Sequence, residues 1–419
     1  MQQIVSPSSV SGSVFAPPSK SYSHRAIICA SLAEGKSRIR GFLESDDINA
    51  TIEAVRAFGA KVTRQNGCLE IEGCFPKPPS SPINCQESGS TARFFIPIMA
   101  LAGKGTITGE KGLLKRPMQP IIDALSKAGV SINSTGGFLP LEISGPYRGG
   151  RIEIKGDVSS QFISGILFAA SLAKKETMLT VIGKLESKPY IRTTLEVLGD
   201  FGIIVKTDSS LLSYHIPALQ RCTPRAYSVQ GDFSSAAFLL AAGAIAGKVE
   251  VSNLKINSAQ GDRAIASLLK EMGCSITADA NAGKITSEKS PLHGIKIDAC
   301  DIPDLVPILA VLACYAKGKT TIYNAARLRI KESDRLNAIA CELKKMGAKI
   351  EEKEDGLLIA GGVLHGAVID PHGDHRIAMS CAIAALGAEG KTVIKNAEVI
   401  RKSYPNFFSD MKKFGARVS

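Results

Sequence analysis

Six short polar segments stand immediately before apolar stretches that have the composition of buried helices. In chain order they read PPSKSYSHR, NCQESGSTAR, KGDVSSQF, QGDFSSAAF, ACDIPDLV and PHGDHRIAM. Small hydroxyl residues, glycines and charged residues crowd in these turns. A helix N-terminus supplies free N–H groups and about half a positive charge, and phosphates and carboxylates bind at such places. The segments therefore predict sites for small anions.

Four cations in these segments strengthen that prediction. Serine and aspartate at a helix start are explained equally well as ordinary N-caps. The cations Lys20, Arg25, Arg93 and Arg376 are not explained in this way, because the helix dipole disfavours positive charge at an N-terminus. These four side chains need either an anionic ligand or an acidic neighbour.

The composition of the chain indicates which class of anion it binds. The formal net charge is +12, and a surplus of Lys and Arg can serve nucleic acid, an anionic membrane or acidic small molecules. The basic residues are scattered, aromatic residues reach only 5%, and Trp is absent, so the stacking platforms of a nucleic-acid binder are poorly supplied. Acidic small molecules are the favoured partners. A basic nucleic-acid-binding protein is the alternative from another class.

The cysteines and the apolar runs of the sequence indicate the cellular compartment in which the protein works. The chain has ten Cys and no C-x-x-C pair, and several lie inside apolar stretches, which favours reduced thiols over disulfides or a zinc site. No secretory signal is visible at the start of the sequence. The longest apolar runs stop short of the ~18 residues that a membrane span needs. We expect a cytoplasmic protein with no membrane segment and no metal.

A motif recurs about every seventy residues, in which an amphipathic helix ends in glycine and continues into an alternating strand. The six glycines are Gly59, Gly129, Gly202, Gly273, Gly347 and Gly415. Glycine relieves the left-handed conformation that follows many helices. A second mark has the same period, a small residue that closes the apolar helix of each repeat. These residues are Ala33, Ala102, Ala173, Ala246, Ala316 and Ala388.

The two marks predict a unit of strand, helix, strand, helix, strand and a further strand. Such units are too long and too few for a solenoid of short repeats. Six of them predict an α/β protein with two domains of three units each, divided between Gly202 and Ala246. The apolar helices are predicted to fill the domain interiors.

Nine motifs, which run from about Lys20 to Lys402, resemble those of the 5-enolpyruvylshikimate-3-phosphate (EPSP) synthase family. They are PPSKSYSHR, ESGSTAR, LKRPMQP, VSSQF, SKPYIRTT, IPD, RIKESDR, GDHRIAM and RKSYPNFF. The resemblance implies two domains of three βαβαββ units, like an inverse αβ barrel. It implies crossings near Pro18 and Gln230, so that residues 1–18 with 230–419 form one domain and residues 19–229 the other. It also implies an active site in the cleft between them.

The family's reaction joins shikimate-3-phosphate to phosphoenolpyruvate and releases phosphate. The 5-hydroxyl adds to C2 of phosphoenolpyruvate while C3 takes a proton, and the tetrahedral adduct then eliminates phosphate. The resemblance implies these two substrates as partners, with glyphosate as an inhibitor. It implies neither a cofactor nor a metal, and a monomer with no nucleic-acid or membrane partner.

The family's roles carry over onto matching positions. The residues that resemble shikimate-3-phosphate ligands are Lys20, Ser21, Arg25, Ser159, Ser160, Gln161, Ser187, Asp304 and Lys331. Those that resemble the phosphoenolpyruvate site are Lys20, Gly89, Arg93, Arg116, Gln161, Arg335, Arg376 and Lys402. Asp304 resembles the base at the 5-hydroxyl, and Glu332 resembles the acid that protonates C3. Lys20 is the third predicted catalytic residue. We expect Asp304 and Glu332 to come from different repeats.

Three positions depart from the commonest family pattern. Glu87 and Phe94 flank the glyphosate-sensitive turn and leave inhibitor affinity open, and Arg327 adds an anion contact with no assigned role. The enzyme alternative is UDP-N-acetylglucosamine enolpyruvyl transferase, which shares the fold. That family places a reactive Cys five residues before an Arg-Pro pair, and here Lys111 stands at that distance from Arg116.

Overall fold

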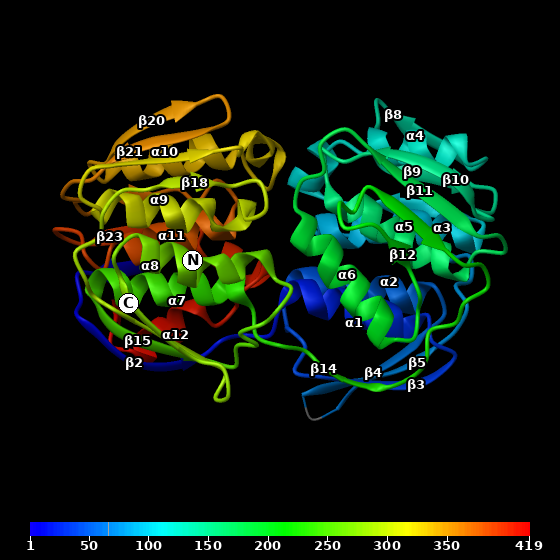
Figure 1. The fold of residues 1–419 in the computed structure, drawn as a ribbon, viewed down its shortest axis with the longest axis horizontal. Coiled ribbons are helices and arrows are strands. Elements are labelled where there is room, and N and C mark those ends of the chain that lie inside the picture. Colours follow the sequence, from blue (N-terminus) through cyan, green and yellow to red (C-terminus); the bar gives the residue numbers. More distant parts are fainter. Residues whose placement is uncertain (66) are drawn as a thin grey trace. The chain divides into compact units, whose positions relative to one another are not determined.

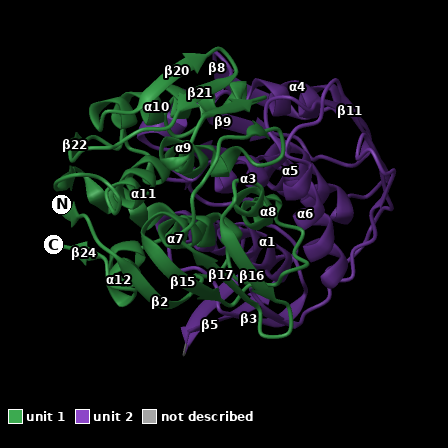
Figure 2. Cartoon of the chain, turned by 60° about the vertical axis from the view of Figure 1, so that its left-hand side comes forward, with its two compact units in different colours: residues 1–19, 230–419 green, residues 20–229 purple. Residues whose placement is uncertain are grey.

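The computed structural model describes residues 1–65 and 67–419. The chain divides into two compact units, each with its own hydrophobic core. Unit 1 consists of residues 1–19 and 230–419, and unit 2 of residues 20–229 (Figure 2). This division assigns Ser19 to unit 1, one residue beyond the crossing expected near Pro18.

Unit 2 contains three repeats of the predicted kind. The first has α1 (Lys20–Ser31), β3 (Gly35–Arg40), α2 (Asp46–Ala57), β4 (Lys61–Gln65) and β5 (Cys68–Gly73), with β14 (Ala226–Ser228) as its leading strand. The second has β6 (Ile83–Asn84), α3 (Gly89–Ala102), β7 (Lys104–Thr108), α4 (Gln119–Lys127), β8 (Ser131–Thr135) and β9 (Phe138–Ser144). The third has β10 (Gly150–Lys155), α5 (Ser160–Leu172), β11 (Thr177–Ile182), α6 (Lys188–Asp200), β12 (Lys206–Thr207) and β13 (Ser213–Ile216).

Unit 1 contains the other three. The first has β2 (Val10–Phe15), α7 (Phe233–Ala246), β15 (Gly247–Ser252), α8 (Ala264–Glu271), β16 (Ser275–Asp279) and β17 (Lys284–Glu288). The second has β18 (Lys296–Asp298), α9 (Val306–Tyr315), β19 (Lys319–Tyr323), α10 (Arg335–Lys345), β20 (Lys349–Lys353) and β21 (Gly356–Ala360). The third has β22 (Val368–Ile369), α11 (His375–Ala384), β23 (Thr392–Ile394), α12 (Phe407–Lys413), β24 (Arg417–Val418) and β1 (Gln3–Ser6).

In the described part of the chain the strands form six four-stranded sheets with one topology. The first two strands of each repeat pair in parallel, and the other pairs are antiparallel. Two sheets contain a strand from the opposite end of their unit's sequence. In unit 2 the last strand, β14, pairs with β3, and in unit 1 the first strand, β1, pairs with β23 and β24. The predicted α/β fold of six βαβαββ units is confirmed.

The first helix of each repeat is buried on nearly every side, as its apolar composition predicts. In unit 1 these helices are α7, α9 and α11, which pack on one another (Figure 1). The second helices bury one face only, as α4 does with Ile121, Ala124 and Leu125. No helix among the described residues is long and apolar enough to cross a membrane.

The helix-ending glycines adopt the conformation that their sequence position predicts. All six have positive φ, from +82° at Gly202 to +105° at Gly59. A side chain at such a position is strained, since only glycine adopts the left-handed region freely. The chain can therefore leave each second helix and enter the next strand of its sheet.

Candidate active site

The polar segments found in the sequence lie at helix starts in the structure. The helices α1, α3, α5, α7 and α11 begin at Lys20, Gly89, Ser160, Phe233 and His375. The last four of these helices carry a side-chain N-cap. The N-cap side chains use some of the free N–H groups, and the cations beside them need their own explanation.

In unit 1 the predicted residues gather around one guanidinium group. Arg335 is 1% exposed, and its Nη1 donates to Oδ1 of Asp304 at 2.7 Å. Its Nη2 donates to Oε2 of Glu332 at 2.6 Å, and its Nε donates to Oδ2 of Asp374 at 2.7 Å. The two carboxylates predicted as base and acid are thus fixed by one side chain. The expectation that they come from different repeats is wrong, because Asp304 precedes α9 and Glu332 precedes α10 of the same repeat.

The cations around Asp304 decide its charge. Nη2 of Arg376 donates to Oδ2 of Asp304 at 3.1 Å. Burial raises the pKa of Asp304, but Arg376, Lys331 and Arg335 together hold that pKa well below its usual range. Burial also lowers the pKa of Lys331 to about 8, although Asp304 pulls it upward. Asp304 is therefore charged, and it becomes a stronger base when anions neutralise the neighbouring cations.

The turn before α11 supplies further groups. Asp374 caps this helix, and its Oδ1 accepts from the backbone N–H of Arg376 at 2.9 Å. Lys402 donates to the backbone carbonyl of Gly373 in the same turn at 3.1 Å. Sequence reasoning missed Asp374 as the third carboxylate on Arg335. The sequence did hold a signal for Asp374, because it stands at the expected N-cap position of a helix, close to the cation Arg376.

A second missed acid is Asp262, which lies just before α8 and is buried. It accepts a hydrogen bond from the hydroxyl of Ser234. Burial, and then the charge of Asp304, raise the pKa of Asp262 to about 7, while Arg376 acts in the opposite direction. Nothing in its sequence neighbourhood distinguishes it from a surface aspartate.

In unit 2, Lys20 has the acidic neighbour that its position at a helix start requires. Its Nζ lies 2.8 Å from Oδ2 of Asp47, which belongs to the first turn of α2. The side chain of Lys20 is 18% exposed. Sequence reasoning did not single out Asp47, because α2 is not one of the apolar helices.

The start of α3 combines a glycine with two guanidinium groups. A Cβ atom on Gly89 would lie 2.6 Å from Nη1 of Arg116 and 3.5 Å from Nη1 of Arg93. That nitrogen of Arg93 donates to Oε1 of Gln161 at 2.8 Å, and Nε2 of Gln161 donates to the hydroxyl of Ser90 at 2.7 Å. The structure therefore brings four predicted residues together at one helix start. Guanidinium groups beside free backbone N–H groups suit a carboxylate or phosphate.

Arg25 is packed into the core of unit 2. It donates to the hydroxyl of Thr194 at 2.7 Å and to the carbonyls of Ser21 and Tyr190 at 2.8 and 3.0 Å. Its guanidinium carbon lies 5.1 Å from the ring centroid of Phe94. Burial lowers the pKa of Arg25 to about 10, so it stays charged near neutral pH. These contacts tie the start of α1 to α6.

The predicted serines occupy the starts of α5 and α6. Ser159 caps α5 by accepting from the backbone N–H of Gln161 at 3.3 Å, and Ser160 is buried beside it. Ser187 stands before α6 with φ of +57° and makes no side-chain cap bond. The left-handed region costs a non-glycine residue about 1 kcal/mol, and such strain concentrates at functional sites.

The three residues that depart from the family pattern have structural partners. Oε1 of Glu87 lies 3.4 Å from Nζ of Lys111. Phe94 is buried beneath the guanidinium of Arg25. Arg327 donates to the backbone carbonyl of Cys300.

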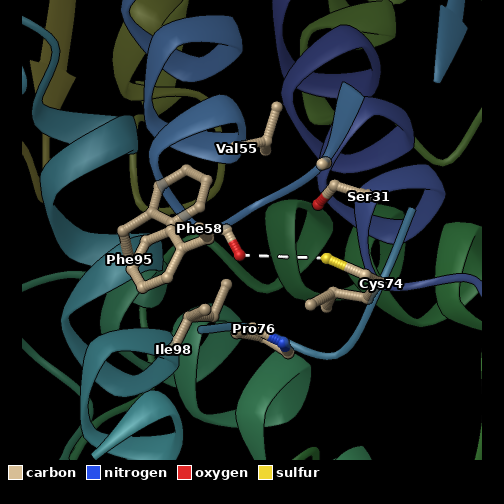
Figure 3. A pocket seen from close by; sticks show the side chains of 9 residues that line it. Ser31, Val55, Phe58, Cys74, Pro76, Phe95 and Ile98 are labelled. Atoms are coloured by element: carbon tan, nitrogen blue, oxygen red, sulfur yellow. Dashed lines mark hydrogen bonds between the residues drawn. The ribbon is translucent and has the colours of Figure 1, made fainter. Parts of the chain in front are cut away.

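Two cavities lie apart from the predicted residues. One, in unit 2, has a volume of about 10 Å³, the lower limit for a single water molecule (Figure 3). The sulfur of Cys74 on its wall lies 3.8 Å from the carbonyl oxygen of Phe58. The other, in unit 1, has a volume of about 320 Å³ and is lined by Lys289, Tyr315 and Lys317 among others.

Residues 1–65 and 67–419 contain no group of three or more His, Cys, Asp or Glu side chains that could hold a metal.

Comparison with known proteins gives one consistent result. The family described as EPSP synthase (3-phosphoshikimate 1-carboxyvinyltransferase) matches residues 4–411. The 3-phosphoshikimate 1-carboxyvinyltransferase of Methanocella arvoryzae is 47% identical over 99% of both chains. The protein of the same name from Clostridioides difficile is 42% identical over 98% of this chain and 97% of its own.

A solved structure extends the similarity to the fold. The EPSP synthase of Acinetobacter baumannii superposes with a TM-score of 0.84 at 30% sequence identity. The match covers 100% of this chain and 99% of the other. The similarity therefore includes both units and every segment that carries a predicted residue.

Proposed function

Because the chain belongs to the EPSP synthase family, we propose that the residues described above bind its two substrates and move the protons of its reaction. The enzyme transfers the enolpyruvyl group of phosphoenolpyruvate to the 5-hydroxyl of shikimate-3-phosphate, a step of aromatic amino-acid biosynthesis. The hydroxyl oxygen adds to C2 and loses its proton while C3 gains one. Phosphate then leaves C2 as C3 gives its proton up.

The main support for the proposal is that two carboxylates accept hydrogen bonds from the guanidinium group of Arg335. Asp304 and Glu332 accept from its Nη1 and Nη2 at 2.7 and 2.6 Å. We assign Asp304 as the base at the 5-hydroxyl and Glu332 as the acid at C3. Arg376 and Lys331 hold down the pKa of Asp304, so anionic substrates that neutralise these cations raise its basicity when they bind.

The remaining predicted residues supply binding. For phosphoenolpyruvate we propose Lys20, Gly89, Arg93, Arg116, Gln161, Arg335, Arg376 and Lys402. For shikimate-3-phosphate we propose Lys20, Ser21, Arg25, Ser159, Ser160, Gln161, Ser187, Asp304 and Lys331. These residues belong to both units. We therefore propose that each pair of bound substrates contacts residues of unit 1 and residues of unit 2. Every proposed Arg has the planar fork that grips carboxylate or phosphate with two hydrogen bonds.

Three finer proposals concern inhibitor, assembly and location. Glyphosate competes with phosphoenolpyruvate for the anion site at the start of α3, where the missing Cβ of Gly89 lets the guanidinium of Arg116 lie against the backbone. The protein works as a monomer, because the residues proposed for both substrates are all present in one chain. The protein works in the cytoplasm, because its ten cysteines are thiols in the described part of the chain, which suits a reducing compartment.

The alternatives are not favoured. The sequence and fold comparisons agree on EPSP synthase rather than on UDP-N-acetylglucosamine enolpyruvyl transferase. Lys111 stands where that enzyme has its reactive Cys, and it faces Glu87 at 3.4 Å. A nucleic-acid-binding function has only the net charge of +12 in its support.

The acid–base assignment is tested with Asp304→Asn and Glu332→Gln. A general acid or base supplies ~10²–10⁴-fold in rate, so each variant should lose turnover by about that factor. Glu332→Gln, which is not among the proposed shikimate-3-phosphate ligands, should still bind that substrate. Glu332→Gln should also stop exchange of solvent deuterium into C3 of phosphoenolpyruvate. Glu351→Gln, at an exposed position of the same unit, is the control. Unchanged deuterium exchange in Glu332→Gln removes this residue from the proton path.

A further inference from the structure

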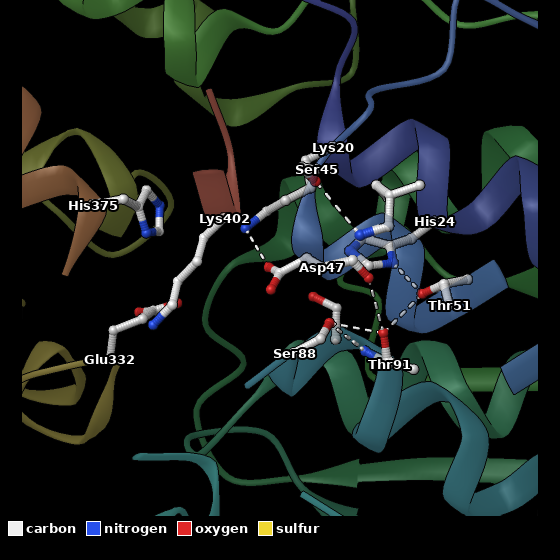
Figure 4. Close-up of polar contacts among 12 residues, drawn as sticks. Lys20, His24, Ser45, Asp47, Thr51, Ser88, Thr91, Glu332, His375 and Lys402 are labelled. Carbon is white, nitrogen blue, oxygen red and sulfur yellow. Dashed lines mark hydrogen bonds and ion pairs between the residues drawn. The ribbon is translucent and has the colours of Figure 1, made fainter. Parts of the chain in front are cut away.

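Two pairs of side chains join α1 to α2 in unit 2. Lys20 and His24 lie one helical turn apart on α1, and Asp47 and Thr51 lie one turn apart on α2, so each pair shares a helix face. Lys20 meets Asp47 at 2.8 Å, and Nδ1 of His24 lies 2.7 Å from the hydroxyl of Thr51 (Figure 4). The first pair is partly exposed, and the second is buried.

A third helix is attached through Thr91, in the first turn of α3. Its hydroxyl lies 2.8 Å from that of Thr51 and 2.7 Å from that of Ser88, the N-cap of α3. It also lies 3.4 Å from the backbone carbonyl of Asp47 (Figure 4). The network therefore fixes α2 against the turn that carries Gly89 and Arg93.

The network is made of neutral groups apart from the ion pair at its exposed end. Burial, and then the charges of Lys20 and Arg25, lower the pKa of His24 well below its usual value. Each hydroxyl has one proton, so the tautomer of His24 sets the direction of the hydrogen bonds through Thr51 and Thr91. A buried network is rigid when its members are paired. Here Nδ1 of His24 and the hydroxyls of Thr51 and Thr91 are paired, whereas Nε2 of His24 has no hydrogen-bond partner among the described residues.

Lys20 gains its position from this network. Its four-carbon side chain is flexible, and it stands at a helix start where the dipole of α1 repels it. An ammonium group has three donors, and in residues 1–65 and 67–419 the polar partner of Lys20 is Asp47. Two donors remain for ligands. Asp47 is itself favoured at the start of α2 by the dipole of that helix.

We propose that Asp47 is a positioning residue, which the hydroxyl network from Thr51 and Thr91 holds in place and which aims the ammonium group of Lys20 at the substrates. This inference rests on the proposed function, in which Lys20 contacts both substrates. The competing explanation is an ordinary ion pair that contributes little to stability and nothing to catalysis.

The first test compares two neighbouring acids. Asp47→Asn keeps the shape of the side chain and loses its charge, and misplacement of a substrate-binding group costs about a hundredfold in kcat/KM. We expect that loss in Asp47→Asn. Asp46→Asn, at the exposed adjacent position in the same helical turn, should stay within about twofold of wild type. Equal activities of the two variants would overturn the proposal.

The second test asks whether Asp47 acts through Lys20. Calorimetric titration with shikimate-3-phosphate needs no turnover, so Lys20→Met, Asp47→Asn and the double variant can all be measured. We expect Asp47→Asn to weaken binding and the double variant to bind as weakly as Lys20→Met, because without the ammonium group Asp47 has nothing left to position. Multiplication of the two single effects in the double variant would show that Asp47 acts independently of Lys20.

The third test uses the hydroxyl network and covers the case in which Asp47→Asn does not fold. Thr91→Val removes the hydroxyl at nearly constant volume, and Thr91→Ser keeps it. We expect kcat/KM to fall in Thr91→Val and to be restored in Thr91→Ser at similar melting temperatures. Equal losses in both would contradict the network. Absence of phosphate release by wild type with both substrates would instead contradict the proposed function.

Discussion

Arg335 shows how one residue can serve both folding and chemistry. All three of its nitrogens are engaged by Asp304, Glu332 and Asp374, and these contacts, opposed by burial, raise its pKa well above the usual value. Removing one member of a buried ion network costs about 3–5 kcal/mol, since the remaining charges lose their partner. Loss of activity in an Arg335 variant would therefore have two causes, lower stability of the fold and loss of the catalytic arrangement. Asp304→Asn and Glu332→Gln remove one carboxylate each and keep the shape of the side chain, and a thermal melt of each variant measures how much of its lost activity comes from lost stability.

Gly89 allows a prediction about the anion site. In Gly89→Ala the new methyl group would lie 2.6 Å from Nη1 of Arg116, so the buried guanidinium must shift. We expect a higher KM for phosphoenolpyruvate, weaker inhibition by glyphosate, and little change in the affinity for shikimate-3-phosphate. Steady-state kinetics with glyphosate as a varied inhibitor measure all three. Unchanged KM and inhibition constants would separate Gly89 from the phosphoenolpyruvate site.

Asp262 predicts a pH dependence of stability. Its pKa rises from 3.8 to about 7 on folding, so between these values the folded protein holds a proton that the unfolded chain has lost. Its contribution to stability is thus present at low pH and is lost as pH rises toward 7. Asp262→Asn removes this linkage, so the variant should gain stability relative to wild type between pH 5 and pH 8. Thermal melts at both pH values test this, and an equal difference at both would contradict it.

At the scale of elements, helix starts were predictable and their partners were not. The polar turns before apolar stretches located the starts of α1, α3, α5, α7 and α11 from local pattern alone. The partners come from other helices, such as Asp47 of α2 for Lys20 and Asp374 before α11 for Arg335. Local spacing contains no information about which distant carboxylate will face a given cation. The family motifs supplied the pairing of Asp304 with Glu332, which spacing could not.

The glycines after the second helices give a prediction at this scale. Gly129 has φ of +87°, and a Cβ atom there would have no atom within 4 Å. Gly129→Ala should therefore cost about 1 kcal/mol from backbone strain alone. Gly129→Asn should cost less, because asparagine tolerates the left-handed region. Urea unfolding of both variants measures the difference, and equal midpoints would exclude strain as the cause.

At the scale of the whole molecule, the period of about seventy residues predicted the number of repeats. It did not predict that β14 and β1 close sheets at the opposite end of their units. These strands are three and four residues long, and β6, β12 and β22 have only two residues each. Such segments are too short for an alternating pattern to appear. Their positions follow from the sheets that they complete.

This chain joins shikimate-3-phosphate to the enolpyruvyl group of phosphoenolpyruvate. The most direct test is phosphate release by the purified protein with both compounds, with each alone, and with UDP-N-acetylglucosamine in place of shikimate-3-phosphate. We predict release only when shikimate-3-phosphate and phosphoenolpyruvate are present together, in step with formation of the enolpyruvyl ether. Release with UDP-N-acetylglucosamine, or no release with the predicted pair, would contradict the account.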